Sequence, residues 1–180
     1  MKPRIGTAVV ILMLAASAVS FSAQAPPPAK PGPEMQRLQA LVGNWTFTEE
    51  YEKTPMTPQG GEGKGSFRTR LGPGGFSIVS DFEGVWPVGK FEGLQIITWD
   101  AKENAYKSYT LGNDFPGVMV ATGHWEGNAL VFTGEVEFAG SKMYNRSEMR
   151  DIGPKAMTYF SYFGPQSPPP LFATGKATKP

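Results

Sequence analysis

Hydrophobic and polar residues alternate along most of the chain from about residue 44 onward. In the segment 44–53, Trp45, Phe47 and Tyr51 occupy alternate positions, and a period of two places their side chains on one face of a β-strand. The same pattern returns in further segments bounded by Gly, Pro, Asn or Asp, which predict strands at about 67–71, 76–82, 91–99, 106–111, 117–126, 129–138, 142–152, 156–163 and, more weakly, 171–177. Short strands joined by tight turns, with no helix between them, predict an antiparallel meander. One apolar face and one polar face are typical of a barrel or a sandwich with a single interior.

One helical pattern precedes these strands. Within residues 34–42, Met35, Leu38, Leu41 and Val42 recur at the spacing of a helix. Gly43 follows where a helix commonly ends. We therefore expect a short N-terminal helix that leads directly into the first strand.

The first 25 residues have the pattern of a secretory signal peptide. A positively charged start and the apolar stretch from Ile5 to Val19 are followed by Ala23-Gln24-Ala25, which has the small-x-small form of a cleavage site. Pro26 disfavours a cut after Ala25, so cleavage after Ser20 or Ser22 remains open. Residues 26–33 (PPPAKPGP) read as an extended spacer. We expect one domain over residues 34–178, exported to the periplasm or the exterior of a bacterial cell, with no membrane span after signal cleavage.

Composition narrows the function classes. Seventeen Lys and Arg residues against sixteen Asp and Glu residues give a formal net charge of +1, and the basic residues are scattered. The chain therefore has no electrostatic footprint for a nucleic-acid partner. It contains no cysteine, which excludes disulfides, a thiolate nucleophile, Cys metal ligands and a lipid anchor on Cys.

The single histidine, His124, is the only side chain that suggests haem or metal chemistry. A two-residue turn at Gly127-Asn128 places Trp125 opposite Leu130, which points His124 outward, whereas a three-residue loop would turn it inward. Turn preference favours the outward orientation. One histidine without clustered carboxylates is a poor zinc site, so we expect no metal, no cofactor and no catalytic residue of this type.

Charged residues alternate with the apolar ones on the opposite face of the strands. Arg68 and Arg70 of the second strand would face acidic residues of the first and third strands, as in a solvated ionic wall. If residues 139–142 form a four-residue turn, Glu135 lies opposite Arg146.

The segment Leu38-x-x-Leu41-x-Gly43-x-Trp45 resembles the entry into the barrel of lipocalins and other calycins. More of the chain, residues 34–178, resembles the bacterial exported family called domain of unknown function 1579, through LQALVGNW, Gly63-Lys64-Gly65, RTRLGPGGF, FEGLQIITWD and GHWEGNALVFTGE. The resemblance implies a lipocalin-like antiparallel β-barrel of about 8–10 strands in the bacterial envelope, with Gly43 and Trp45 as a structural plug. It implies no reaction. An Arg near the end of the last strand, which caps this Trp in lipocalins, is not evident.

Two interpretations of the barrel interior are open. The apolar residues either fill it completely or line a pocket for a small hydrophobic ligand. The candidate pocket residues are Phe47, Phe67, Ile78, Phe82, Gln95, Ile97, Trp99, Trp125 and Phe132. Ser80, Gln95 and Asn145 would supply polar contacts, and Gly84, Gly93, Gly123 and Gly134 would remove bulk from the wall.

Three functions follow from these interpretations. The first is an exported barrel that binds a small apolar molecule. The alternative is a non-catalytic interaction or structural module of the cell envelope. The third is a calycin-type enzyme, because Glu49 and Tyr51 share the predicted inner face of the first strand.

Overall fold

The computed structural model describes residues 29–180, so the predicted signal peptide and the first part of the spacer lie outside the described residues. The chain begins with the helix α1 (Pro33–Arg37) and a 3-10 turn (Leu38–Leu41), together the predicted short helix. Ten strands follow: β1 (Gly43–Tyr51), β2 (Gly61–Leu71), β3 (Ser77–Trp86), β4 (Gly89–Asp100), β5 (Ala105–Gly112), β6 (Met119–Glu126), β7 (Ala129–Phe138), β8 (Ser141–Arg150), β9 (Ala156–Gly164) and β10 (Leu171–Thr178). A second 3-10 turn (Pro73–Gly75) joins β2 to β3.

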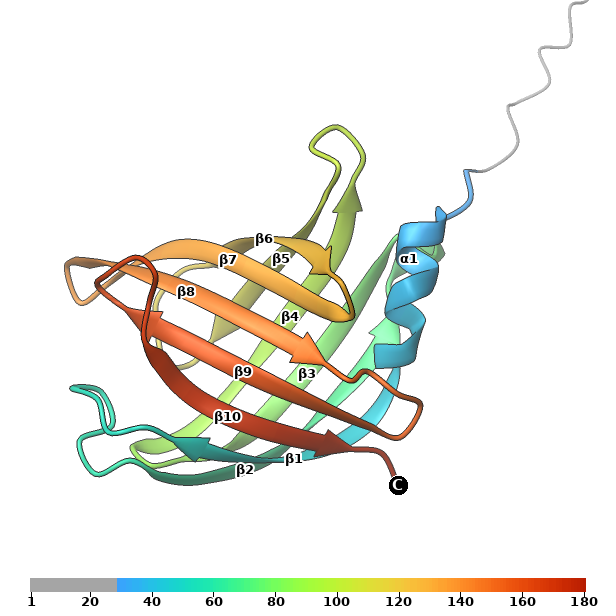
Figure 1. The fold of residues 1–180 in the computed structure, drawn as a ribbon. Coiled ribbons are helices and arrows are strands. Elements are labelled where there is room, and N and C mark those ends of the chain that lie inside the picture. The colour runs from blue at the N-terminus through green and yellow to red at the C-terminus, as the bar shows by residue number, and fades with distance from the viewer. Residues whose placement is uncertain (1–28) are drawn as a thin grey trace, which may run out of the picture.

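The ten strands form one closed antiparallel barrel. Each strand pairs with its neighbour in the chain, and β1 closes the barrel by pairing with both β2 and β10 (Figure 1). The predicted fold, a lipocalin-like antiparallel barrel with a short N-terminal helix, is confirmed, at the upper end of the expected strand number. Among residues 29–180, helices are all too short or too polar to cross a membrane.

The helical segment lies against one end of the barrel (Figure 1). Its apolar residues Met35, Leu38 and Leu41 are buried in the same core cluster as Trp45 of β1 and Tyr106 of β5. Burial of these side chains removes apolar surface from water and holds the helix against the strand ends. The helical segment therefore acts as a cover for this end.

Two turns set the registers of β6, β7 and β8. Glu126 pairs with Ala129 around Gly127, whose φ is +62°, in the two-residue turn predicted from its sequence. The four-residue turn considered at 139–142 does not form, so Glu135 does not lie opposite Arg146. Phe138 pairs with Ser141, because Ala139 and Gly140 both adopt positive φ, as a tight type I′ turn requires.

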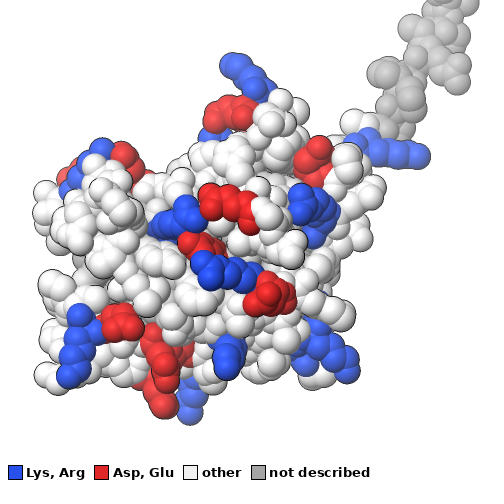
Figure 2. Space-filling model, in the orientation of Figure 1, with Lys and Arg blue, Asp and Glu red and all other residues white. Residues whose placement is uncertain are grey.

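The corrected register changes the ion pairs on the outer wall. Glu135 faces Tyr144 and binds Lys142 at 2.7 Å, not Arg146. Arg146 instead contacts Glu126 at 3.0 Å and Glu148 at 2.7 Å. Figure 2 shows acidic and basic residues interspersed over the visible face, with no broad region of one sign. This is the solvated ionic wall that the alternating charges predicted.

Candidate functional site

The interior of the barrel is divided into two halves. The large inner side chains that are buried lie near α1, with half-buried rings such as Trp99 and Trp125 packed against them; the buried ones include Trp45, Ile78, Ile97, Tyr106, Leu130, Phe132 and Met157. Large inner side chains toward the opposite end are only half-buried, including Phe82, Phe91, Met119, Tyr159 and Phe163. The half near α1 is therefore a packed core, and the far half keeps contact with solvent.

Trp45 is the centre of the packed half. Its indole N–H donates to the carbonyl oxygen of Leu41 at 2.8 Å, and its ring stacks on Phe67 with centroids 5.7 Å apart. No arginine was evident at the end of the last strand to cap this ring, and the structure places Lys179 there, with its Nζ 4.4 Å from the ring centroid. A lysine rather than an arginine therefore occupies the capping position.

Lys179 also joins the end of the chain to the helical segment. Its Nζ donates to the carbonyl oxygens of Ala40 at 2.9 Å and Val42 at 2.8 Å. These are free carbonyls at a helix C-terminus, where a cation is favoured. Gly43, with φ +140°, leaves room for the lysine: an added Cβ would lie 3.0 Å from its Cε.

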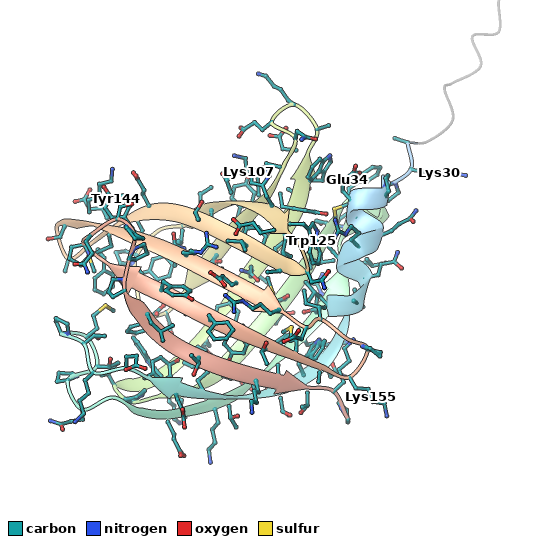
Figure 3. All side chains as sticks on the ribbon, viewed as in Figure 1. Lys30, Glu34, Lys107, Trp125, Tyr144 and Lys155 are labelled. Carbon is teal, nitrogen blue, oxygen red and sulfur yellow. The ribbon has the colours of Figure 1, made fainter. Side chains whose placement is uncertain are left out.

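A second set of contacts ties α1 to β5 and β6. Trp125 donates through Nε1 to the Tyr106 hydroxyl at 3.2 Å, and that hydroxyl donates to the Glu34 carbonyl at 2.9 Å. Arg37 of α1 lies over the Trp125 ring, 4.0 Å from its centroid. Figure 3 shows Trp125 beside the helix. Trp125 therefore helps to hold α1 against the barrel through its contacts with Tyr106 and Arg37.

Five inner aromatic rings lie over a directly paired glycine on the neighbouring strand. The directly paired positions are Phe47 with Gly65, Phe82 with Gly93, Phe91 with Gly84, Phe132 with Gly123 and Tyr159 with Gly175. In each pair, a Cβ added to the glycine would overlap the ring. The rings therefore lie along the wall, in space that the glycines leave. Of the four glycines expected to thin the wall, Gly84, Gly93 and Gly123 are covered in this way, and Gly134 lies beside the Asn145 amide.

The three expected polar contacts differ in what they offer. Ser80 is buried and shares a hydrogen bond of 2.7 Å with Thr69. Gln95 donates to Ser108 at 3.0 Å and, more weakly, to Thr110 at 3.5 Å. Asn145 has only the sulfur of Met119 as a contact for its Nδ2, at 3.2 Å, and its buried Oδ1 has no hydrogen-bond partner within residues 29–180.

The candidate pocket residues all face inward but do not form one group. Ile78, Ile97, Trp99, Trp125 and Phe132 belong to the packed half near α1, with Phe47 and Phe67 beside them. Phe82 and Gln95 are half-buried and lie farther along their strands. Alternation determines which face a side chain takes, but it does not determine the side chain's height in the barrel.

A half-buried carboxyl lies in the far half. Glu49 accepts a hydrogen bond from the Tyr51 hydroxyl and a second from Tyr159 of β9. Burial raises the pKa of the Glu49 carboxyl above its usual range, and the two hydrogen bonds oppose that rise. Burial and the nearby negative charge raise the pKa of both tyrosines, so their hydroxyls stay protonated donors. The sequence pattern grouped Glu49 with Tyr51 but missed Tyr159.

Aromatic rings gather at the mouth of the far half. Tyr51 lies 5.4 Å from Phe172 and 6.0 Å from Trp86 between ring centroids, and Trp86 lies 6.2 Å from Phe172. These three rings belong to β1, β3 and β10. Side chains from three strands therefore narrow the open end of the barrel.

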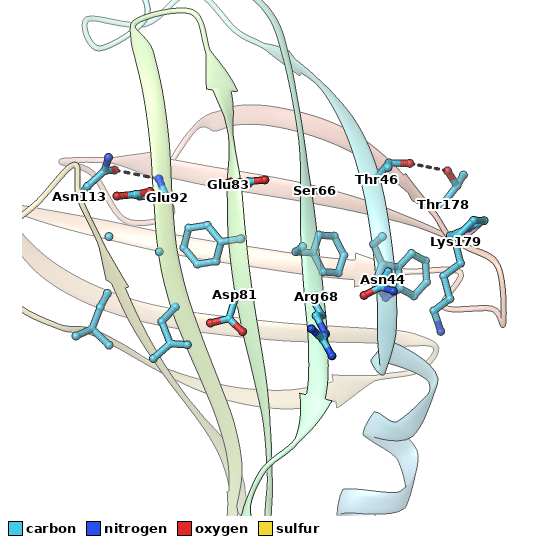
Figure 4. Close-up of a pocket in the computed structure, with 18 residues that line it drawn as sticks. Asn44, Thr46, Ser66, Arg68, Asp81, Glu83, Glu92, Asn113, Thr178 and Lys179 are labelled. Carbon is cyan, nitrogen blue, oxygen red and sulfur yellow. Dashed lines mark hydrogen bonds between the residues drawn. The ribbon is translucent and has the colours of Figure 1, made fainter.

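A separate groove of about 970 Å³ crosses the outer wall. Its side chains include Asn44, Arg68, Asp81 and Glu92 from β1 to β4, with Lys179 at one edge (Figure 4). It is open to solvent, and of the predicted pocket residues its lining includes Phe67 and Phe82. His124 is also on the outer wall, exposed and paired with Val131. Residues 29–180 contain no cluster of three potential metal-binding residues.

These features define a class: a ten-stranded calycin-type barrel with one end closed by a short helix and a Trp. The chain belongs to the family described as "Protein of unknown function (DUF1579)", whose model matches residues 30–162. No match was found among the curated proteins.

Two solved structures show the same fold at low identity. One is the S-type phycobiliprotein lyase CPES from Guillardia theta, with 14% identity, a TM-score of 0.53, and coverage of 81% of this chain and 90% of that chain. The other is Rv2717c from M. tuberculosis, with 10% identity, a TM-score of 0.57, and coverage of 84% and 99%. At such identities the likeness establishes the fold alone.

Proposed function

We propose that this protein binds a small hydrophobic molecule in the half of the barrel that lies away from α1. The observation that carries the proposal is the division of the interior: the buried large inner side chains all lie toward α1, whereas the large inner side chains of the far half, such as Phe82 and Met119, are half-buried. Eight strands already make a barrel just wide enough for a filled core or one small ligand, and the diameter grows with strand number. Ten strands therefore favour space for a ligand.

The lining suits an apolar molecule with a few polar atoms. Rings that lie over glycines offer flat apolar walls, and ligand sites combine such walls with few polar groups. The buried Oδ1 of Asn145 supplies one of these groups, because it has no hydrogen-bond partner among the described residues. A ligand N–H or O–H at this atom would remove the cost of an unsatisfied buried acceptor.

The proposal is tested with the full mature chain and the neutral dye Nile red. We expect saturable binding with a blue-shifted emission, and native mass spectrometry of protein isolated from its own cells should show a retained small molecule. Thr110→Trp would place a large ring in the far half, since Thr110 faces inward beside Gln95. It should abolish dye binding.

Thr133→Trp is the matched control, because Thr133 is exposed on the outer wall. It should leave dye binding unchanged. The proposal fails if the folded parent binds no dye, or if both tryptophan variants bind it as the parent does.

We also propose that the chain is exported to the bacterial periplasm or beyond. Support comes from the N-terminal pattern of charged start, apolar stretch and small residues before Pro26. The intact mass of the protein from a periplasmic fraction would give the cleavage position, after Ala25, Ser22 or Ser20. A chain that retains Met1 and remains in the cytoplasmic fraction would contradict export.

A second candidate function is non-catalytic contact with another protein through the outer wall. Tyr109 and Leu111 of β5, with Val118 and Val120 beside them, are exposed apolar residues, and Tyr109 pairs directly with Val120. Contiguous exposed apolar surface marks contact sites. A second copy of this chain is the partner that we propose for this surface. Sedimentation should show a dimer that Val120→Glu dissociates, and a concentration-independent monomer would count against it.

A further inference from the structure

Glu49 lies between two glycines in the wall of the far half. Gly63 of β2 and Gly175 of β10 are its directly paired neighbours. Neither neighbouring strand therefore places a side chain beside the carboxyl. A Cβ at Gly63 would lie 2.7 Å from the Tyr51 ring and 3.3 Å from Glu49 Oε2, so this space is already used.

Two phenol rings fold over these glycines toward the same carboxyl. Tyr159 covers Gly175, and Tyr51 covers Gly63. Both hydroxyls hydrogen-bond to Glu49. The glycines thus give the two hydroxyls access to one carboxyl from opposite sides, which fixes its position on the inner wall.

The negative charge of this carboxyl has no positive partner in residues 29–180. None of the ion pairs among these residues includes Glu49. Two hydroxyl donors satisfy part of a carboxylate's hydrogen-bonding capacity, which is about four lone-pair sites. A half-buried unpaired carboxylate is costly, and a cation would offset that cost.

The neighbouring rings also favour a cation. Phe47 and Tyr51 flank Glu49 along the inner face of β1, and Phe47 lies 6.5 Å from Tyr159 between ring centroids. Aromatic faces attract ammonium groups through their quadrupoles. A carboxylate among three rings is therefore suited to an amine joined to an apolar body.

We propose that Glu49 is the recognition point for a protonated amine, so that the protein takes cationic amphiphiles: apolar molecules that carry one ammonium group. The ammonium donates to the Glu49 carboxylate, and the apolar body extends along the rings toward Phe82 and Phe91. This inference rests on the proposed lumen binding and specifies its ligand class.

Three probes with one fluorophore test the inference on the full mature chain. Dansylcadaverine carries an ammonium group, dansylamide is neutral, and dansylglycine carries a carboxylate. Fluorescence titration at neutral pH should give about tenfold tighter binding of dansylcadaverine than of dansylamide, as expected for one charge-assisted hydrogen bond. Dansylglycine should bind most weakly.

Glu49→Gln keeps the shape of the side chain and removes its charge. It should abolish the preference for dansylcadaverine and leave dansylamide binding unchanged. The matched control is Glu50→Gln, because Glu50 is an exposed carboxylate on the outer face of the same strand. It should keep the full preference.

The outcomes separate the two proposals. Equal binding of dansylcadaverine and dansylamide by the parent would overturn the amine inference and leave lumen binding intact, and this result needs no variant to fold. A preference that survives Glu49→Gln in a folded chain would overturn the role of Glu49. If none of the three probes binds, the amine inference fails, and lumen binding fails as well if the parent also does not bind Nile red.

Discussion

Replacement of Trp45 by alanine tests whether the packed half near α1 holds the barrel together. The side chain is buried, donates to Leu41 and stacks on Phe67. Truncation of a large buried aromatic costs about 3–5 kcal/mol. Loss of the ring also removes the cation–π contact of Lys179, worth about 0.5–2 kcal/mol. Because a domain is stable by about 5–15 kcal/mol, we expect Trp45→Ala to lose a large part of its stability.

Urea denaturation followed by far-UV circular dichroism measures this loss. The midpoint should fall while the slope stays constant, which shows a change in stability rather than in the extent of unfolding. Trp86→Ala is the comparison at the opposite end, where the side chain is half-buried, and it should cost less, about 1–2 kcal/mol. A loss under about 1 kcal/mol for Trp45→Ala, or an equal loss at Trp86, would refute the assignment of the packed core to the helix end.

Three further changes test other parts of the structure. Gly93→Ala should cost about 1–3 kcal/mol, because its Cβ would overlap the Phe82 ring and the Leu111 carbonyl. Gly153→Ala should stay within about 0.5 kcal/mol, because its Cβ would make only ordinary van der Waals contacts, and equal urea midpoints for the two variants would contradict the ring-on-glycine packing. Lys179→Met should lose about 1–3 kcal/mol in the same assay, since two charged hydrogen bonds disappear; an unchanged midpoint would mean that the lysine does not hold the helix. His124→Ala should match the parent in thermal melting and dye binding, and a Soret band lost in the variant would instead show haem ligation.

The strands and the short helix could be predicted because both depend on local periodicity. The positions of Trp45 and Phe47 show a period of two within a few residues, and those of Leu38 and Leu41 show a helical spacing. The turn at Gly127 was predictable for the same reason, since glycine readily adopts positive φ. The turn at 139–140 was not, because Ala139 rarely takes that conformation and does so here with φ of +50°.

The site was harder to predict because it depends on contacts between distant strands. Lys179 reaches carbonyls 137 and 139 residues earlier in the chain, and no local pattern encodes that distance. Tyr159 reaches Glu49 only because Gly175 lies between them in the sheet, on a strand paired with both. Once the strand order is known, a glycine paired with an inner carboxylate indicates that a side chain from the next strand can reach that carboxylate.

Closure of the barrel by β1 and β10 has a consequence for how the chain folds. Thr46 pairs with Thr178, so the last seam joins residues 132 positions apart. Contacts of such long range form slowly, because the entropy of loop closure is lost before they can stabilise the fold. During synthesis, β1 therefore has an unpaired edge until β10 has been made, and such edges invite pairing with other chains. A chaperone that shields β1 would raise the yield of monomeric protein, and its absence would favour strand exchange between nascent copies.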